Sequence, residues 1–229
     1  MQPGSVFSEA FDLYKRFWQH FVPIALIVFV IIAVASLVLG ATLGTLGLMF
    51  AAILSLVGIF WLQGAIAEAV SDVRDGRADL SIGETLNKVG PRVGALVAAG
   101  LLAALGVMIG LVLLIVPGLV LLTWWSVLIP AIVLERAGVF EAFGRSRELV
   151  RGNGWNVFGV IVLSLLIVLG ANLAVSLALA WLPDGIRSFF QSLVGNTIIT
   201  PFIAAAWTIM YFQLRGERAA EPAVAARLS

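Results

Sequence analysis

The run from Phe21 to Ala67 contains no residue with a formal charge, and it constrains the fold more than any other feature of the chain. A single helix needs only about 20 apolar residues to cross the hydrocarbon core of a bilayer. The run is interrupted by glycines at 40, 44 and 47, which are typical of a turn. We therefore expect two transmembrane helices, at 22–41 and 47–68.

Three further uncharged stretches predict four more spans. The stretch from Gly94 to Leu134 is divided by Val116-Pro117-Gly118, which favours a tight turn because proline lacks a backbone donor. With 61% apolar and only 12% charged residues, the chain lacks the charged surface of a soluble domain. The expected fold is an all-α polytopic transmembrane helical bundle of about six spans, a single domain over 1–214 followed by a short, disordered cytoplasmic tail at 215–229. The last four spans are expected at 94–115, 118–134, 155–182 and 189–213.

Lysine and arginine are distributed unevenly between the two sides of this six-span arrangement. The chain has 14 of them, and all except Arg187 fall before span one, after span six, or in the loops that follow spans two and four. Cytoplasmic loops carry an excess of Lys and Arg, so this side and both termini are expected to be cytoplasmic. A cleavable signal peptide is the alternative for the first helix, since Ala33-Val34-Ala35 resembles a cleavage site. The apolar run continues beyond this site to Leu39, which favours a retained helix.

Three charged segments on the predicted cytoplasmic side have apolar residues on one helical face and charged residues on the other. They begin near Glu9, Glu84 and Glu141, and each runs into a pair of spans, so the chain is predicted to contain three degenerate copies of one unit. In the second segment, Ser81 and Glu84 have the spacing of a capping box. Amphipathic helices beside a span are expected to lie in the membrane interface.

Two roles are open for these interfacial helices. They can serve only as anchors that connect the hairpins. Alternatively, the third helix binds anionic lipid headgroups through Arg145, Arg147 and Arg151, although Glu141 and Glu148 dilute this basic cluster.

Few polar residues fall inside the predicted spans. Gln63, Glu68 and Asn172 are candidates for one polar pathway, with proton-coupled transport through Glu68 as the sharpest hypothesis. The alternative is that Glu68 reaches headgroup water from a helix end. Asn172, with Asn196, Thr197 and Thr200, can equally well form hydrogen bonds between helices. Pro130 and Pro201 can break spans four and six.

Trp124 and Trp125 are expected near mid-membrane, whereas tryptophan usually lies at the interface. Two explanations are open. Both side chains can pack inside the bundle, or span four can enter the membrane less deeply.

Several function classes are excluded or disfavoured by composition. The chain has no cysteine and one histidine, His20, which removes thiolate chemistry and metal sites built on several histidines. It shows no phosphate loop, nucleotide fingerprint or paired-carboxylate motif. We therefore predict that the protein is not an enzyme and has no cofactor. Acidic residues alternate with basic ones in every loop, which makes nucleic-acid binding unlikely.

Two consecutive segments, 117–135 and 141–158, carry a family resemblance. The first is a proline-glycine turn followed by a hydrophobic helix. The second resembles the pattern A-x-x-R-S-x-x-L-x-x-G-N-x-W-x-x-F. Together they resemble the membrane domain fused to glycerophosphoryl diester phosphodiesterases and its free-standing bacterial relatives of unknown function. The matching residues of the second segment are Arg145, Ser146, Leu149, Gly152, Asn153, Trp155 and Phe158.

The resemblance implies a multi-pass protein of the bacterial plasma membrane, without phosphodiesterase activity, because that catalysis belongs to a separate soluble domain. Within this pattern, Gly152 and Asn153 both tolerate the left-handed conformation that ends a helix. The favoured function is a non-enzymatic membrane module that interacts with lipids or with a membrane partner, which can be a second copy of the chain. The alternative is a small-solute permease or channel, because repeated hairpins often place substrate sites between them.

Overall fold

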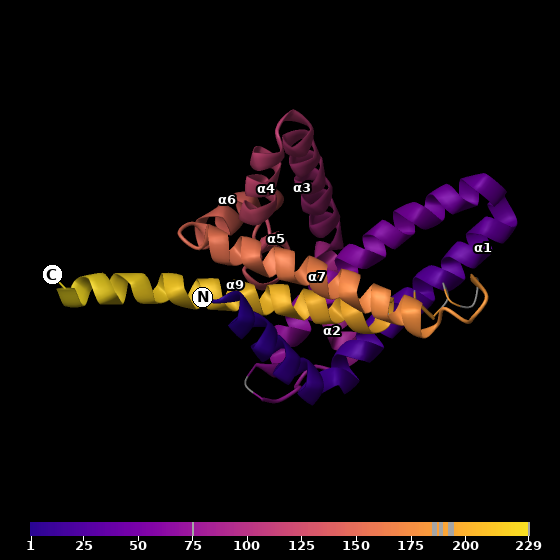
Figure 1. Ribbon diagram of the computed structural model, residues 1–229, viewed down its shortest axis with the longest axis horizontal. Coiled ribbons are helices and arrows are strands. Elements are labelled where there is room, and N and C mark those ends of the chain that lie inside the picture. Colours follow the sequence, from indigo (N-terminus) through magenta and orange to yellow (C-terminus); the bar gives the residue numbers. More distant parts are fainter. Residues whose placement is uncertain (75, 185–186, 188–189, 192–194, 229) are drawn as a thin grey trace.

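The computed structural model describes residues 1–74, 76–184, 187, 190–191 and 195–228, with side chains described as far as residue 219. This part of the chain is helical and contains no strand, which confirms the predicted all-α class (Figure 1). The elements are α1 (Pro3–Val73), α2 (Ile82–Val89), η1 (Gly90–Arg92), α3 (Val93–Leu113), α4 (Ile115–Trp124), α5 (Leu128–Leu134), α6 (Val139–Val150), α7 (Gly154–Ala178), the π-helical turn η2 (Gly195–Ile199) and α9 (Thr200–Leu228).

Helix α1 is a hairpin with two long arms (Figure 1). The bend lies at Gly44, whose φ of +55° and ψ of −129° are outside the range that side chains with a Cβ adopt readily. This position lies inside the turn expected between spans one and two. A second irregularity, at Phe17 (φ −119°, ψ 26°), separates the amphipathic N-terminal segment from the first apolar arm.

Helices α3 and α4 form a second hairpin, and its turn differs from the prediction. The break lies at Leu114, whose φ of −157° and ψ of 135° are extended, and Pro117 and Gly118 lie within the first turns of α4. Proline fits there because the backbone donors of a first helical turn have no partner inside the helix. Gly118 also permits close packing: a Cβ on Gly110 would come within 2.9 Å of the Gly118 Cα.

Span four is not one continuous helix. The expected span at 118–134 is divided into α4 and α5 by a turn, in which Trp125 (φ −102°, ψ 11°) and Val127 (φ −107°, ψ 22°) leave helical geometry. The α3–α4 hairpin then projects at a steep angle from the direction of α7 and α9 (Figure 1). Because Trp125 and Val127 are not helical, the direction of α4 is not fixed by that of α5.

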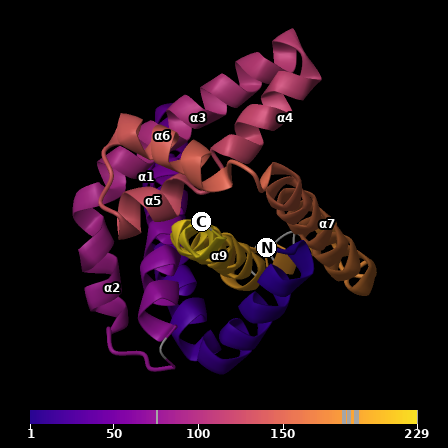
Figure 2. The ribbon, with the colours of Figure 1, turned by 90° about the vertical axis from the view of Figure 1, so that its left-hand side faces the viewer.

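Helix α9 is the centre of the bundle, with α1, α5 and α7 arranged around it in the end-on view (Figure 2). Its buried side chains join those of the N-terminal segment of α1 and of α6 in one apolar core, while a smaller core lies between α1, α3 and α5. The start of the predicted sixth span, residue 189, lies outside the described residues. The expected disordered tail at 215–229 includes backbone of α9, which continues to Leu228. Side chains of α9 that are buried in the larger core are Ala205, Ala206, Ile209, Met210, Tyr211 and Leu214.

The predicted amphipathic segments form the start of α1, helix α2 and helix α6. The capping box of α2 is confirmed: the Glu84 backbone N–H donates to Ser81 Oγ at 3.3 Å, and the Ser81 N–H donates to Glu84 Oε2 at 2.8 Å. At the start of α6, the Gly138 N–H donates to Glu141 Oε2 at 3.2 Å. Helices α2 and α6 therefore each have, as their third residue, a glutamate that the repeat pattern had indicated.

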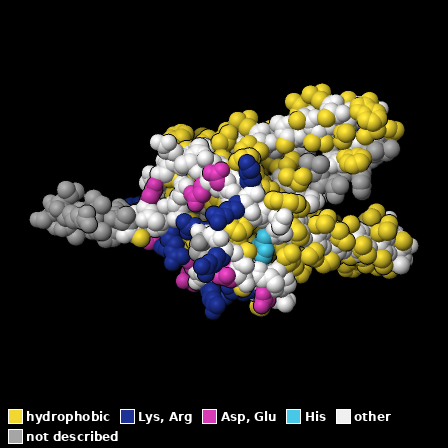
Figure 3. All heavy atoms as spheres, turned by 90° about the horizontal axis from the view of Figure 1, so that it is seen from below, with side chains coloured by type: hydrophobic (Ala, Val, Ile, Leu, Met, Phe, Trp, Pro, Cys, Tyr) yellow, Lys and Arg dark blue, Asp and Glu magenta, His cyan; other side chains and the backbone are white. Residues whose placement is uncertain are grey.

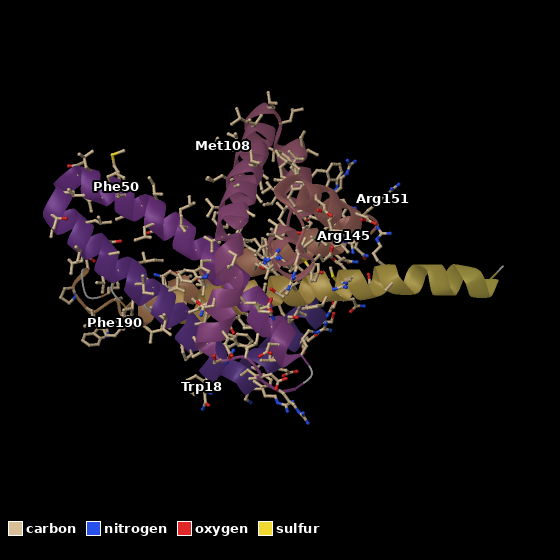
Figure 4. The ribbon with its side chains drawn as sticks, turned by 180° about the vertical axis from the view of Figure 1, so that it is seen from behind. Trp18, Phe50, Met108, Arg145, Arg151 and Phe190 are labelled. Atoms are coloured by element: carbon tan, nitrogen blue, oxygen red, sulfur yellow. The ribbon has the colours of Figure 1, made fainter. Side chains whose placement is uncertain are left out.

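Charged and apolar surfaces are separated. On the face shown in Figure 3, Lys, Arg, Asp and Glu side chains gather over one half of the molecule, and the other half is almost entirely hydrophobic. Phe50 and Met108 lie towards the tips of the two hairpins, far from Arg145 of α6 and from Arg151, which follows α6 (Figure 4). In the described residues, five helical segments are long and apolar enough to cross a membrane: Pro3–Val73, Ile82–Leu113, Ile115–Leu134, Gly154–Ala178 and Gly195–Ala219. The first of these segments, Pro3–Val73, has two apolar arms because α1 bends at Gly44.

Candidate functional site

A cavity of about 480 Å³ lies between four parts of the bundle: the second arm of α1, the break between α4 and α5, helix α7, and the η2–α9 segment. Most of its wall is apolar, with side chains such as Ile129, Ile203 and Trp207. The polar part of the wall consists of hydroxyls and amides, and no described side chain that lines it carries a charge. These polar residues are Gln63, Ser126, Asn172, Gln191, Asn196, Thr200 and Thr208.

The polar side chains of the wall differ in how far they are already hydrogen-bonded. The Asn172 amide donates to the Val168 carbonyl at 2.8 Å, and the Thr208 hydroxyl donates to the Ala204 carbonyl at 2.9 Å. Within the described part of the chain, the side-chain amides of Gln63 and Asn196 have no hydrogen-bond partner. They therefore offer donors and acceptors to a neutral polar group of a ligand.

The π-helical turn Gly195–Ile199 forms one side of the cavity. Such turns are rare and occur frequently at functional sites. Pro201 follows it and cannot donate a backbone N–H, which leaves a carbonyl of the preceding turn without its helical partner. The Thr200 hydroxyl donates to the Gly195 carbonyl at 3.0 Å and so satisfies one acceptor of this irregular segment.

The break between α4 and α5 forms the opposite side and is held by Ser146 of α6. The buried Ser146 hydroxyl donates to the Trp124 carbonyl at 2.7 Å and accepts from the Val127 N–H at 3.3 Å. Both backbone groups belong to the interrupted turn, where a continuous helix would have paired them. The Ser126 hydroxyl donates to the Thr123 carbonyl at 2.9 Å. One side chain of α6 therefore satisfies two backbone groups of the break.

Glu135, at the end of α5, is the centre of a charged cluster beside the break. Arg145 Nε and Nη2 donate to its two oxygens at 2.6 and 3.1 Å, and the Tyr211 hydroxyl donates to it at 2.8 Å. Burial alone would raise the pKa of Glu135, but these hydrogen bonds and the charges of Arg145 and Arg215 lower it below its usual value. Arg145 also donates to Glu148 at 3.0 Å, and these contacts raise its own pKa.

Trp124 and Trp125 are half-buried and both contact side chains of α6. The guanidinium of Arg147 lies 4.2 Å from the centre of a Trp124 ring. The Trp125 and Phe143 rings meet edge to face, with centroids 4.9 Å apart. The helix break turns both indoles towards the charged helix.

The predicted lipid-contact arginines have different environments. Arg145 is held by two carboxylates and Arg147 by Trp124, so both side chains stabilise the protein itself. Arg151 is exposed, and its backbone carbonyl accepts a hydrogen bond from Arg218.

The predicted polar pathway is only partly brought together. Gln63 and Asn172 both line the cavity, and so do Asn196 and Thr200. Glu68 does not line it, because this buried carboxylate forms an ion pair with Lys88 in a different pocket. Sequence reasoning did not assign Ser126 or Trp207 to a site, nor Ser146 to the helix break. The mid-span position of Trp124-Trp125-Ser126 was the one signal that pointed there.

The arrangement is that of a helical membrane protein with a neutral cavity between its apolar helices. No group of three or more His, Cys, Asp or Glu that could hold a metal ion occurs among the described residues. Comparisons with protein-family models, with curated proteins and with solved structures found no match. The resemblance to the phosphodiesterase-associated membrane domain therefore remains a prediction.

Proposed function

We propose that this chain is a non-enzymatic, multi-pass protein of the bacterial plasma membrane that binds a lipid or lipid-like amphiphile in the cavity between α1, α5, α7 and α9. Its charged half, with both termini, faces the cytoplasm. The uneven distribution of Lys and Arg supports this orientation.

The observation that carries the proposal is the character of the cavity wall. A volume of about 480 Å³ is within the range of small-molecule sites, and the wall is apolar with a few amides and hydroxyls. An acyl chain fits the apolar surface, and an ester or hydroxyl group fits the amides of Gln63 and Asn196. A charged ligand would lose its hydration without gaining a counter-charge there.

Native mass spectrometry of the purified full chain in mild detergent tests this binding. We expect one molecule of added diacylglycerol, a lipid without a charged headgroup, to remain bound to the wild-type protein. Ala204→Phe, which fills the cavity, removes this lipid. The matched control Ala174→Phe places the same ring on an exposed position of α7 outside the cavity wall and keeps the lipid. A wild-type protein that carries no lipid, or equal retention in Ala204→Phe, contradicts the proposal.

A small-solute permease is the second candidate, and the broken helices favour it. Transporter sites are often formed by discontinuous helices, and both the α4–α5 break and η2 line this cavity. Proteoliposomes assayed with a panel of neutral solutes test it. A permease shows solute flux that Asn196→Leu reduces, whereas the lipid-binding module shows no flux for any solute.

A further inference from the structure

A second pocket lies in the charged half of the molecule and shares no lining residue with the cavity described above. Its volume is about 370 Å³, and it lies between α1, the α2–η1 segment, the end of α5 and α9. Its charged lining residues are Glu68, Lys88, Arg92, Arg136 and Arg215.

The balance of charge in this pocket is positive. Among the described residues that line it, Glu68 is the one acidic residue, and it forms an ion pair with Lys88. In the described part of the chain, Arg92, Arg136 and Arg215 form no salt bridge. The nearby carboxylate of Glu135 accepts hydrogen bonds from Arg145 and Tyr211, although its charge still acts on Arg215. Arg92 Nη1 donates to the Ile132 carbonyl at 3.0 Å. Its remaining donors and the guanidinium groups of Arg136 and Arg215 line one pocket without a salt bridge.

The backbone of Arg136 supports a role for its side chain. Its φ of +60° is the one positive φ of a non-glycine residue among the described residues. Such a conformation favours glycine or asparagine and disfavours a long side chain by roughly 1 kcal/mol or more. Arg136 comes shortly after the end of α5, next to Glu135 in the sequence. The two neighbours have different contacts: Glu135 accepts a hydrogen bond from Arg145, and Arg136 lines the pocket.

We infer that this pocket binds a phosphate group, carried either by a lipid headgroup or by a free phosphate. Guanidinium groups match phosphate because they donate two parallel hydrogen bonds to its oxygens. Basic pockets between membrane helices on the cytoplasmic side are typical sites for anionic headgroups. Val133, Leu134 and Phe212 form an apolar side of the pocket, beside which the glycerol and acyl part of a lipid would lie.

Lipid titrations of the full chain in neutral detergent, followed by native mass spectrometry, test this inference. The readout is the ratio of the affinities for short-chain phosphatidylglycerol and phosphatidylcholine. The cavity has no charged lining residue among those described, so lipid binding there does not alter this ratio. We expect the wild-type protein to prefer phosphatidylglycerol by at least about tenfold. The triple variant Arg92→Gln, Arg136→Gln, Arg215→Gln loses this preference. The control Lys15→Gln, Arg16→Gln, Arg77→Gln removes the same charge from exposed positions outside the pocket and keeps this preference.

Arg136→Gly separates binding from folding. Glycine adopts a φ of +60° without strain, so this variant is at least as stable as the wild type, yet its preference for phosphatidylglycerol falls by about fivefold. Inorganic phosphate distinguishes the two sources: if it displaces phosphatidylglycerol, the site recognises phosphate itself, and if it does not, the site requires the lipid. A wild-type protein without a preference and without phosphate binding overturns the inference. An unchanged preference in a stable Arg136→Gly protein does the same.

Discussion

The hydroxyl of Ser146 on α6 donates a 2.7 Å hydrogen bond to the carbonyl oxygen of Trp124, the last residue of α4. The same hydroxyl accepts a hydrogen bond from the Val127 N–H. Together, the two bonds pair the Trp124 carbonyl and the Val127 N–H where the helix is interrupted inside an apolar bundle. The interruption in turn forms one wall of the cavity. The α6 segment is therefore a support for the site.

Ser146→Ala leaves the Trp124 carbonyl and the Val127 N–H without their partner in a buried place. We expect a loss of about 1–3 kcal/mol in the free energy of unfolding, because unpaired buried polar groups are costly. Thermal unfolding followed by tryptophan fluorescence measures it. Ser8→Ala, at an exposed position of α1, serves as the control and leaves the midpoint unchanged.

Arg145 and Arg147 of α6 and Arg151, which follows α6, have unequal structural importance. Arg145→Lys loses the two-pronged contact with Glu135 and destabilises the protein by about 1–2 kcal/mol, a value reduced by the partial exposure of both side chains. Arg147→Lys loses its contact with Trp124 and costs less than about 1 kcal/mol. Arg151→Lys has almost no effect. Equal losses for Arg145→Lys and Arg151→Lys in urea unfolding are incompatible with the geometry described.

The lowered pKa of Glu135 predicts a dependence of stability on acid pH. A carboxyl group with a lower pKa in the folded than in the unfolded protein contributes stability that is complete above its ordinary pKa of 4.5. That contribution is lost as the pH falls through the folded-state pKa. When the pH is lowered from 5 to 3, the temperature of half-unfolding should therefore decrease more steeply in the wild type than in Glu135→Gln. Parallel curves for the two proteins would show that Glu135 has no such linkage.

The bend of α1 depends on Gly44. Gly44→Ala meets no atom within 4 Å, so any destabilisation comes from its φ of +55° and is expected to be about 1–3 kcal/mol. Gly170→Ala, also without a close neighbour but inside α7, stabilises by about 0.5–1 kcal/mol. Opposite shifts of the unfolding midpoint in these two variants distinguish backbone strain from packing.

Local chemistry made much of the fold predictable from the sequence. Gly44, the Ser81–Glu84 capping box and Gly152, whose φ is +88°, are each determined by neighbouring residues, and all three adopt the expected geometry. The turn near Pro117 was predicted two to three residues too late, because proline is as well suited to a first helical turn as to the turn itself.

The candidate site was harder to predict because its parts meet only through tertiary contacts. Gln63 and Asn172 were singled out and do line one cavity, whereas Glu68 is paired with Lys88, a residue from another helix. The break after Trp124 depends on Ser146, which lies in α6, beyond the intervening helix α5. Hydropathy alone cannot reveal such a contact, because it does not say which distant side chain pairs with the backbone of the break.

The separation of a charged cytoplasmic half from an apolar, lipid-embedded half is the central claim, and thiol labelling tests it most directly. The chain has no cysteine, so Arg77→Cys, Glu148→Cys and Asp184→Cys each carry a single thiol. With a membrane-impermeant maleimide added to intact cells, we predict labelling at position 184 and none at 77 or 148 until the cytoplasmic face is opened. Labelling at 77 or 148 from outside intact cells would contradict the account.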